Sequence, residues 1–451
     1  MSRNKDSLVI RFNNGHIAAI ENSANCEVYM MTETENFMAL DFKRFCESEQ
    51  IQRVSEFTTL LKNRRNVEHF SLQPVPVELM EQVILTAGTS PSGANQQPWK
   101  YALIHELSIK RAIRSAMETE GEEFYSVVKG QIQPQKSELL EEAPFLIAIF
   151  KENFGIKLSE NGEVVKVQHY YAHDSAAISI GFLETAMVQA GLSFVIYPPL
   201  EALKVILKRP ENESPLLLLA VGNPSEGEAT LQKAEVYHQI MKRRRNIRDF
   251  SSEFFNRQII EVALEAMQQT PTPFLIQPYH AVLVVEHEIK QEIRKHAESV
   301  EKQLYEEKIS SAWREALAPL KTNWSKPHLT DAPYLLVVFK AGEEEREVLE
   351  NGQDMNPSMD FDRSKAKWHG KLEGLKRTSV GIAIGVFLSA LHFAGLCSLT
   401  YTPSPMAFLR NLLGRPEDET PIIVLPIGYP KENCHVPRIA KKSLQEILIK
   451  A

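Results

Sequence analysis

The chain contains one folding unit twice. The string RRNVEHFS at 64–71 returns 180 positions later as RRNIRDFS at 244–251. EEAPFLIAIF at 141–150 answers TDAPYLLVVF at 330–339, at a spacing of 189, and RPENESPLLLLAVGNP answers RPEDETPIIVLPIGYP at a spacing of 206. Matches that stay in order while their spacing only grows indicate a tandem duplication with a few loop insertions.

The length agrees with two domains rather than one. A chain of 451 residues is too long for one ordinary core, and two units of roughly 200 residues each suit the usual domain size. Short apolar stretches such as FLIAIF and LLLLAVG alternate with helical patterns in both copies, which predicts an α+β (α/β layered) fold. We expect an N-terminal extension over 1–50 with one strand in SLVIRF, a first domain over 51–235 and a second domain over 236–451, packed together as an intrachain pseudo-dimer.

The net charge and the cysteine pattern limit the classes of binding partner and the cellular setting that we expect. The net charge of −7 argues against a nucleic-acid or anionic-membrane surface. Cys26, Cys46, Cys397 and Cys434 form no CxxC pair and no metal-ligand spacing, so we expect no metal and a reduced, cytoplasmic setting. The first residues show neither an uninterrupted apolar core nor a cleavage site, so no secretory signal is expected.

One apolar stretch, SVGIAIGVFLSALHFAGL at 379–396, has the length of a membrane span. It contains His392, and its repeat partner at 175–192 carries Glu184. Ionisable groups are rare in membrane spans. A buried helix between the two halves is therefore the better interpretation, with a membrane span as the alternative.

The repeated RRN element suits a phosphate. Arg244 and Arg245 precede Asn246 at the start of an expected helix, and guanidinium groups and helix N-terminal amides both pair with phosphate oxygens. Arg248 adds a third guanidinium group, whereas Glu68 stands in its place in the first copy. Ordinary surface arginines are the alternative.

A second element, SPSGANQQPW at 90–99, suits a flat ligand. Gly93 and its small neighbours allow the backbone to approach closely, while Ser92 and Asn95 supply hydrogen bonds. The repeat partner reads TPTPFLIQPY at 270–279. It has lost the glycine and the asparagine, so only the first copy keeps this loop.

Together these motifs resemble the nitroreductase superfamily, whose members bind FMN at a dimer interface. The resemblance rests on RRN with FS four residues on, on PSGAN with QPW, and on the GYP and VP segments. Within the superfamily the chain is similar to the iodotyrosine deiodinases. FMALDFKRFCESEQIQRVSEFTTLLKNRRN is similar to their entry into the fold, and YEEKISSAWREALAPLKTNWSKPHLTDAPYLLVVF resembles their substrate lid. The similarity spans 37–451 as two nitroreductase-like domains.

The resemblance implies a cofactor site divided between the two halves. From the second half it implies as cofactor-binding residues Arg244, Arg245, Asn246, Arg248, Thr400, Tyr401, Thr402 and Lys441. From the first half it implies Pro91, Ser92 and Gly93 for the cofactor, with Ala94 for the substrate. In the family pattern serine is usual at Asn246, arginine at Lys441 and threonine at Tyr401.

The reciprocal site is incomplete by the same comparison. It would need Arg64, Arg65 and Asn66 together with the altered 270–279 loop, and it has no evident counterpart of Lys441. We therefore expect one FMN per chain. Because a pseudo-dimer already contains the interface that single domains bury by dimerising, we also expect a monomer.

Three residues match the substrate-binding residues of the deiodinase lid: Glu301, Tyr305 and Lys326. Glu301 and Tyr305 are four apart and share a helix face. A carboxylate, a phenol and an ammonium can hold both ends of an amino-acid zwitterion. An ordinary charged surface helix is the alternative. The first half has Gly121 in place of the glutamate, beside Tyr125.

The resemblance also implies a reaction. Thr402 matches the family residue whose hydroxyl bonds flavin N5, a contact that favours one-electron steps, and is thus the catalytic candidate. The Ala94 amide would hold the phenolate of a halogenated tyrosine or similar small aromatic amino acid while the lid closes over it. No GxGxxG motif or P-loop occurs, so the electron source, NAD(P)H or a reductase, has no dedicated Rossmann site here.

Three functions remain open from the sequence. The first is an FMN-dependent reductive dehalogenase. The second is a flavin enzyme that performs nitroreduction or dehydrogenation on another small aromatic or amino acid, because this scaffold supports many reactions. The third is a non-catalytic flavin or amino-acid binding protein. His169 and His173 in HYYAH are four apart but lack HExxH and a third ligand, so they favour a structural role over metal binding.

Overall fold

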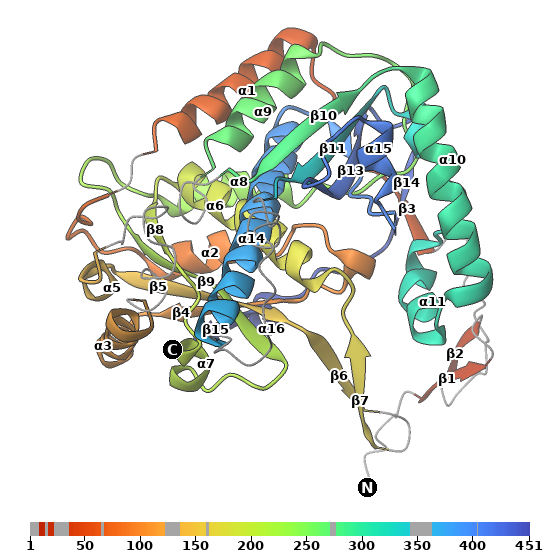
Figure 1. Ribbon diagram of the computed structural model, residues 1–451. Coiled ribbons are helices and arrows are strands. Elements are labelled where there is room, and N and C mark those ends of the chain that lie inside the picture. Colours follow the sequence, from red (N-terminus) through yellow and green to blue (C-terminus); the bar gives the residue numbers. More distant parts are fainter. Residues whose placement is uncertain are drawn as a thin grey trace, which may run out of the picture.

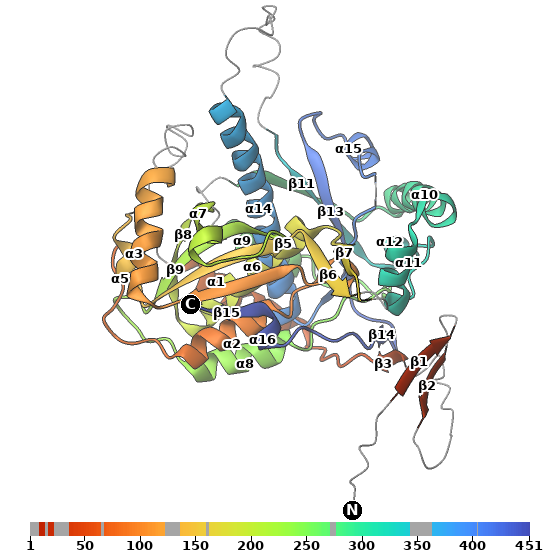
Figure 2. The ribbon, with the colours of Figure 1, turned by 90° about the horizontal axis from the view of Figure 1, so that it is seen from below.

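The structure is a computed structural model, and it describes residues 9–13, 17–21, 36–64, 67–121, 136–158, 162–270, 277–342, 363–403 and 405–451. Two mainly antiparallel sheets lie on either side of a central layer of helices (Figures 1 and 2). This arrangement is the α+β fold expected from the repeat.

The two sheets repeat one topology. The first has the order β15–β4–β5–β9–β8, with bounds Leu448–Lys450, Trp99–Ile104, Phe145–Glu152, Glu213–Gly222 and Ser193–Tyr197. The second has the order β10–β11–β13–β12, with bounds Tyr279–Val284, Tyr334–Lys340, Thr420–Gly428 and Cys397–Ser398. Both carry an irregularity at matching places, between Ile149 and Phe150 and between Val338 and Phe339. The shared strand order and bulge confirm the tandem duplication.

Matching helices surround the sheets. Those of the first copy are α2 (Val77–Ala87), α3 (Leu107–Ala116), α5 (Leu139–Glu142), α6 (Ala172–Ala190) and α7 (Ala202–Ile206). Those of the second copy are α9 (Gln258–Gln268), α10 (His287–Gln303), α11 (Ser311–Leu317), α12 (His328–Asp331), α14 (Arg363–Phe393) and α15 (Phe408–Leu412). α1 (Glu47–Lys62), α8 (Leu231–Met241) and α16 (Leu444–Ile447) are the other α-helices of the residues that the structure describes.

The N-terminal segment pairs with other parts of the chain. The expected strand in SLVIRF is β1 (Val9–Asn13), which forms a hairpin with β2 (Ile17–Glu21). β3 (Phe37–Ala39) pairs with β14 (His435–Pro437) near the other end of the sequence. α1 begins at Glu47, so the expected limit of the extension near residue 50 falls inside this helix.

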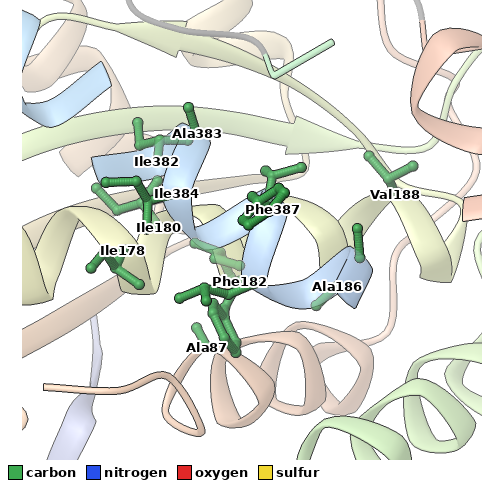
Figure 3. Close-up of a cluster of buried hydrophobic side chains, with 14 of the residues drawn as sticks. Ala87, Ile178, Ile180, Phe182, Ala186, Val188, Ile382, Ala383, Ile384 and Phe387 are labelled. Atoms are coloured by element: carbon green, nitrogen blue, oxygen red, sulfur yellow. The ribbon is translucent and has the colours of Figure 1, made fainter. Parts of the chain in front are cut away.

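The core lies where α6 crosses α14. α6 packs on the first sheet, α14 contacts strands of the second, and the two helices pack on each other. Figure 3 shows their apolar side chains interlocked, with Phe182 facing α2 and Phe387 facing α6. Residues 370–393 are long and apolar enough to cross a membrane, and 89% of the apolar window is buried inside the protein. The expectation of a buried helix between the halves therefore holds.

The crossing is nearly symmetric, because equivalent residues make reciprocal contacts. A Cβ on Gly181 would overlap the carbonyl oxygen of Ile382, and a Cβ on Gly385 would overlap that of Ile178. Thr185 and Ser389, which are 204 positions apart, face each other with their hydroxyls at 3.5 Å. These contacts form a pseudo-twofold interface within one chain, as expected for a fused dimer.

Replacing Gly385 by alanine is expected to destabilise the protein by at least about 2 kcal/mol, since overpacking against fixed backbone strains a core. Gly374→Ala, in the same helix, is the matched control because its Cβ would meet nothing within 4 Å. It should be neutral or slightly stabilising, because alanine favours a helix over glycine. Urea unfolding of both variants measures the difference, and equal free energies of unfolding would refute the tight crossing.

Candidate active site

A cavity between the two halves brings together most of the residues expected from the sequence. It is lined by Pro91, Ser92, Gly93, Ala94, Asn246, Arg248, Glu301, Tyr305, Lys326, Thr400, Tyr401 and Thr402. A smaller cavity shares Pro91, Ser92, Asn246 and Arg248 with the first and adds Arg244, Arg245 and Lys441. Every predicted cofactor- or substrate-binding residue thus lines one of two overlapping cavities.

The first domain contributes a strained loop over 90–97. Ala94, Asn95 and Gln97 have φ angles of 47°, 54° and 51°, in the left-handed region that non-glycine residues adopt only when their surroundings require it. The backbone N–H of Gln97 donates to Ser92 Oγ at 3.0 Å, and that of Gly93 donates to Ser175 Oγ at 3.2 Å. A Cβ on Gly93 would lie 2.6 Å from the Tyr170 carbonyl oxygen, so the loop requires glycine there.

A C-terminal arm of the second domain holds this loop in place. β15 adds to the edge of the first sheet, in parallel with β4. Asn95 Nδ2 donates to the Ala440 carbonyl at 2.9 Å, and Lys442 Nζ donates to the Gln97 carbonyl at 2.9 Å. The same arm delivers Lys441, whose Nζ donates to the Ser90 carbonyl at 2.5 Å. Because this arm of the second domain crosses to the first, both domains contribute to the site.

The small cavity is cationic. Arg244, Arg245 and Lys441 line it, and none of them forms an ion pair with a carboxylate in the described ranges. Burial, together with the charge of Arg245, lowers the pKa of Arg244 to about 10. Burial of the ammonium, together with Arg244 and Arg245, lowers the pKa of Lys441 well below its usual value. Clustered cations that lower one another's pKa are the electrostatic signature of an anion site.

Two further observations support an anion at this place. Arg244 Nε is buried and has no hydrogen-bond partner among the described residues, and a native buried donor is normally paired. Arg244 Nη1 donates to Asn246 Oδ1 at 3.1 Å, and Asn246 Nδ2 donates to Thr400 Oγ1 at 2.9 Å. Asn246 therefore fixes the guanidinium to the segment that carries Thr402. A phosphate group fits this donor set.

The lid residues form a buried ion pair. Lys326 Nζ lies 2.5 Å from Glu301 Oε2, and the two side chains are only 6% and 10% exposed. The Tyr305 hydroxyl contacts Thr322 Oγ1 at 2.8 Å. Desolvation lowers the pKa of Lys326, although Glu301 opposes this shift. The charges on α10 and on the loop before α12 thus face the cavity, which excludes the alternative of a solvated charged helix.

The sequence interpretation missed part of the cavity wall. Tyr171 lines it and directs its hydroxyl to the Thr402 carbonyl at 3.3 Å, and burial raises the pKa of this phenol. Tyr171 follows a hairpin, β6 (Phe154–Leu158) and β7 (Val164–Gln168), that the sequence pattern did not reveal. Trp313 and His328 also line the cavity. In the sequence only the two histidines of HYYAH are weighed, as metal ligands, and Tyr171 carries no signal of its own.

The histidines of HYYAH have structural partners. His173 Nε2 lies 3.0 Å from Thr378 Oγ1 on α14, and His169 Nδ1 lies 3.0 Å from the Glu152 carbonyl oxygen. Burial lowers the pKa of His173 to about 4. Across the residues that the structure describes, no three His, Cys, Asp or Glu side chains are grouped to hold a metal ion.

The equivalent place in the first copy looks different. Arg64, the repeat partner of Arg244, donates to the Phe194 carbonyl at 3.2 Å and lies over the Phe194 ring. The fully buried Glu184 carboxylate lies near Arg64, and its burial raises its pKa. The expectations for Arg65, Asn66, Tyr125 and the loop at 271–276 fall outside the described residues.

The duplicated sheets and the divided, cationic cavity define a fused pair of related α+β domains that share one candidate anion-binding site. The family model described as Nitroreductase family matches residues 61–223 and 241–429. The chain therefore belongs to the Nitroreductase family, in a tandem arrangement, and is an FMN-dependent oxidoreductase.

Curated relatives narrow the resemblance within that family. The iodotyrosine deiodinase of Haliscomenobacter hydrossis is 35% identical over 237 residues, which cover 52% of this chain and 98% of the relative. That of Hydra vulgaris is 39% identical over 204 residues, covering 43% of this chain and 74% of the relative. A solved iodotyrosine deiodinase bound to FMN and 3-iodo-L-tyrosine aligns over 46% of this chain and 95% of its own, with 26% identity and a TM-score of 0.36.

Proposed function

We propose that this protein is a reductive dehalogenase that acts on a halogenated tyrosine or a similar aromatic amino acid. The observation that carries the proposal is the shared cavity, in which the buried Glu301–Lys326 pair faces the Ser92–Ala94 loop and Thr402. The similarity to iodotyrosine deiodinases over about half the chain supports it. The carbon–halogen bond would be replaced by a carbon–hydrogen bond, with two electrons and one proton taken up and halide released.

The residues of the smaller cavity would hold the cofactor. Arg244, Arg245 and Lys441 would bind the FMN phosphate, since they form the uncompensated cluster. Pro91, Ser92 and Gly93 would support the ring system from the other domain, beside Thr400 and Thr402. Bound FMN would supply the electrons, while the protein supplies position and electrostatics.

The residues of the larger cavity would bind the substrate. Glu301 would accept hydrogen bonds from its ammonium, and Lys326 and Tyr305 would complete the head-group site. The Ala94 amide would hold the phenolate, and Thr402 would donate its hydroxyl to the flavin ring. Leu304, Leu317 and Leu320, which line the same cavity, would exclude water from the ring.

We propose one FMN per chain and a monomeric enzyme. In the first copy Arg64 already contacts the Phe194 carbonyl and ring and lies near the buried Glu184, where the second copy has Leu388 in the aligned helix. These internal partners would compete with a phosphate at this place. NAD(P)H or a separate reductase would deliver the electrons.

Anaerobic titration of the photoreduced holoprotein tests the proposal. We expect 3-iodo-L-tyrosine to reoxidise the flavin and release iodide and tyrosine, whereas a nitroarene reacts more slowly. Reoxidation by the nitroarene alone would indicate a nitroreductase instead, and reoxidation by neither would indicate a binding protein. Flavin absorbance and iodide release are the measurements.

The pKa of Lys441 gives a pH dependence. In the apoprotein this pKa is lowered well below 10.5, so between the folded and unfolded pKa values the unfolded chain binds more protons. Stability of the apoprotein should therefore rise with pH across that window. FMN phosphate would stabilise the ammonium, so FMN affinity should fall across the same window.

Lys441→Met should remove both trends. Urea unfolding of the apoprotein and fluorescence titration with FMN, each over a pH series, measure them. An identical pH profile in the Lys441→Met variant would contradict the assignment.

A further inference from the structure

Tyr401 enters the cavity from the body of the second domain rather than from the lid. Its backbone pairs with Val424 of β13, with N–O distances of 3.0 Å and 2.8 Å in the two directions. The His328 ring packs edge-on against its phenol, with ring centroids 5.3 Å apart. The residue is 8% exposed, so packing against the body of the domain holds its hydroxyl in place.

That hydroxyl donates to the lid. Tyr401 Oη lies 2.6 Å from Glu301 Oε1, while the other oxygen of Glu301 faces Lys326 Nζ at 2.5 Å. Desolvation and the neighbouring Glu301 carboxylate raise the pKa of Tyr401, so the phenol keeps its proton and remains a donor. Both oxygens of Glu301 are therefore fixed, one from the body of the domain and one from the lid segment.

The remaining hydrogen-bonding capacity matches an amino-acid head group. A carboxylate offers about four acceptor positions, and Tyr401 and Lys326 each occupy one on Glu301. An ammonium has three donors, of which Lys326 gives one to Glu301 and another to the Asn323 carbonyl. Among the residues that the structure describes, acceptor positions on Glu301 thus remain open beside an open donor on Lys326. This arrangement complements a neighbouring ammonium and carboxylate.

We propose that Tyr401 is a positioning residue that orients Glu301 toward the substrate's ammonium and ties the lid to the domain body. Recognition of the zwitterionic head group would then depend on a residue outside the lid, whereas recognition of the aromatic ring would not. The inference rests on the proposed function, because it concerns the substrate of the same site. It assigns to the cavity a preference for aromatic amino acids over phenols that lack the head group.

The test is the variant Tyr401→Phe, which removes the hydroxyl and keeps the ring. With the reduced holoenzyme, KM for 3-iodo-L-tyrosine should rise roughly tenfold or more, the loss expected for one hydrogen bond to a charged group. kcat for this substrate and both constants for 2-iodophenol should change little. Tyr101→Phe is the matched control, since it removes a buried hydrogen bond of the same 2.6 Å length to Ser179.

The outcomes separate the two proposals. Three results would overturn the positioning role while leaving dehalogenation intact. The first is an equal change of KM for both substrates, the second is no change of KM for 3-iodo-L-tyrosine, and the third is the same rise of KM in Tyr101→Phe. If the wild-type enzyme turns over neither substrate, the proposed function fails. The positioning role is then decided separately by measuring the binding of L-tyrosine and of phenol through flavin fluorescence. Weaker binding of L-tyrosine alone in Tyr401→Phe supports the role. An affinity for L-tyrosine equal to that of the wild type overturns it.

Discussion

Arg244→Ala is expected to yield a folded protein that no longer retains FMN during purification. Arg244 is buried at the centre of the cationic cavity, and its Nε has no partner among the described residues. Losing charge-assisted hydrogen bonds to a phosphate should weaken FMN binding by roughly a hundredfold, since each such bond contributes about 1.5–3 kcal/mol. The FMN affinity of Arg244→Lys should lie between those of the wild type and Arg244→Ala, because an ammonium keeps the charge but not the planar arrangement of donors.

The duplication supplies the control for this experiment. Arg64 occupies the equivalent place in the first copy, where it donates to the Phe194 carbonyl and lies near Glu184. Arg64→Ala should keep one FMN per chain, although the lost hydrogen bond to the Phe194 carbonyl should lower stability. The ratio of flavin to protein absorbance and fluorescence titration with FMN measure the contrast. Two FMN per wild-type chain, with one retained in each variant, would mean that the two copies bind cofactor equally.

Repetition made much of the fold predictable. Paired strings located β5 and β9 in one sheet and β11 and β13 in the other. Glu184 in one copy of the apolar stretch, with His392 in the other, identified a buried helix rather than a membrane span. Local patterns could not reveal β15, because three residues carry no periodicity and their pairing with β4 depends on how the C-terminal arm crosses to the other domain. The hairpin that precedes Tyr171 was missed for a different reason. Its apolar residues, such as Ile156, Val164 and Val165, are exposed, so no core-facing alternation marks the two strands.

The site was predictable only as a set of residues. Comparison of the two copies identified which half keeps the arginines and which keeps the 90–97 loop, and the structure places these parts at one pair of cavities. The interactions between the parts were not predictable. From the sequence Tyr401 was expected to bind the cofactor and to depart from the family's usual threonine, whereas its hydrogen bond to Glu301 joins residues 100 positions apart. Such a contact depends on tertiary packing and leaves no trace in spacing.

The second large effect is expected from substitution of the buried Glu301–Lys326 pair of the lid. Glu301→Gln should retain FMN but lower kcat/KM for 3-iodo-L-tyrosine by more than roughly a hundredfold, since the substrate ammonium would lose its counter-charge. The same change leaves Lys326 buried without a partner carboxylate, and breaking a buried pair costs about 3–5 kcal/mol. Reduced activity could therefore follow from an opened lid instead of lost recognition. A double variant separates these two causes.

Adding Lys326→Met to Glu301→Gln removes the unpaired charge, so the lid should regain most of its stability. Turnover of 3-iodo-L-tyrosine should nevertheless stay low, because neither end of the zwitterion is then bound, whereas turnover of 2-iodophenol should recover with the lid. Glu292→Gln, at an exposed position of the same helix where the carboxylate pairs with Lys295, is the control and should behave as wild type. Steady-state kinetics with both substrates, beside urea unfolding, measure these effects. Full recovery of iodotyrosine turnover in the double variant would show that the pair only closes the lid and does not recognise the amino acid.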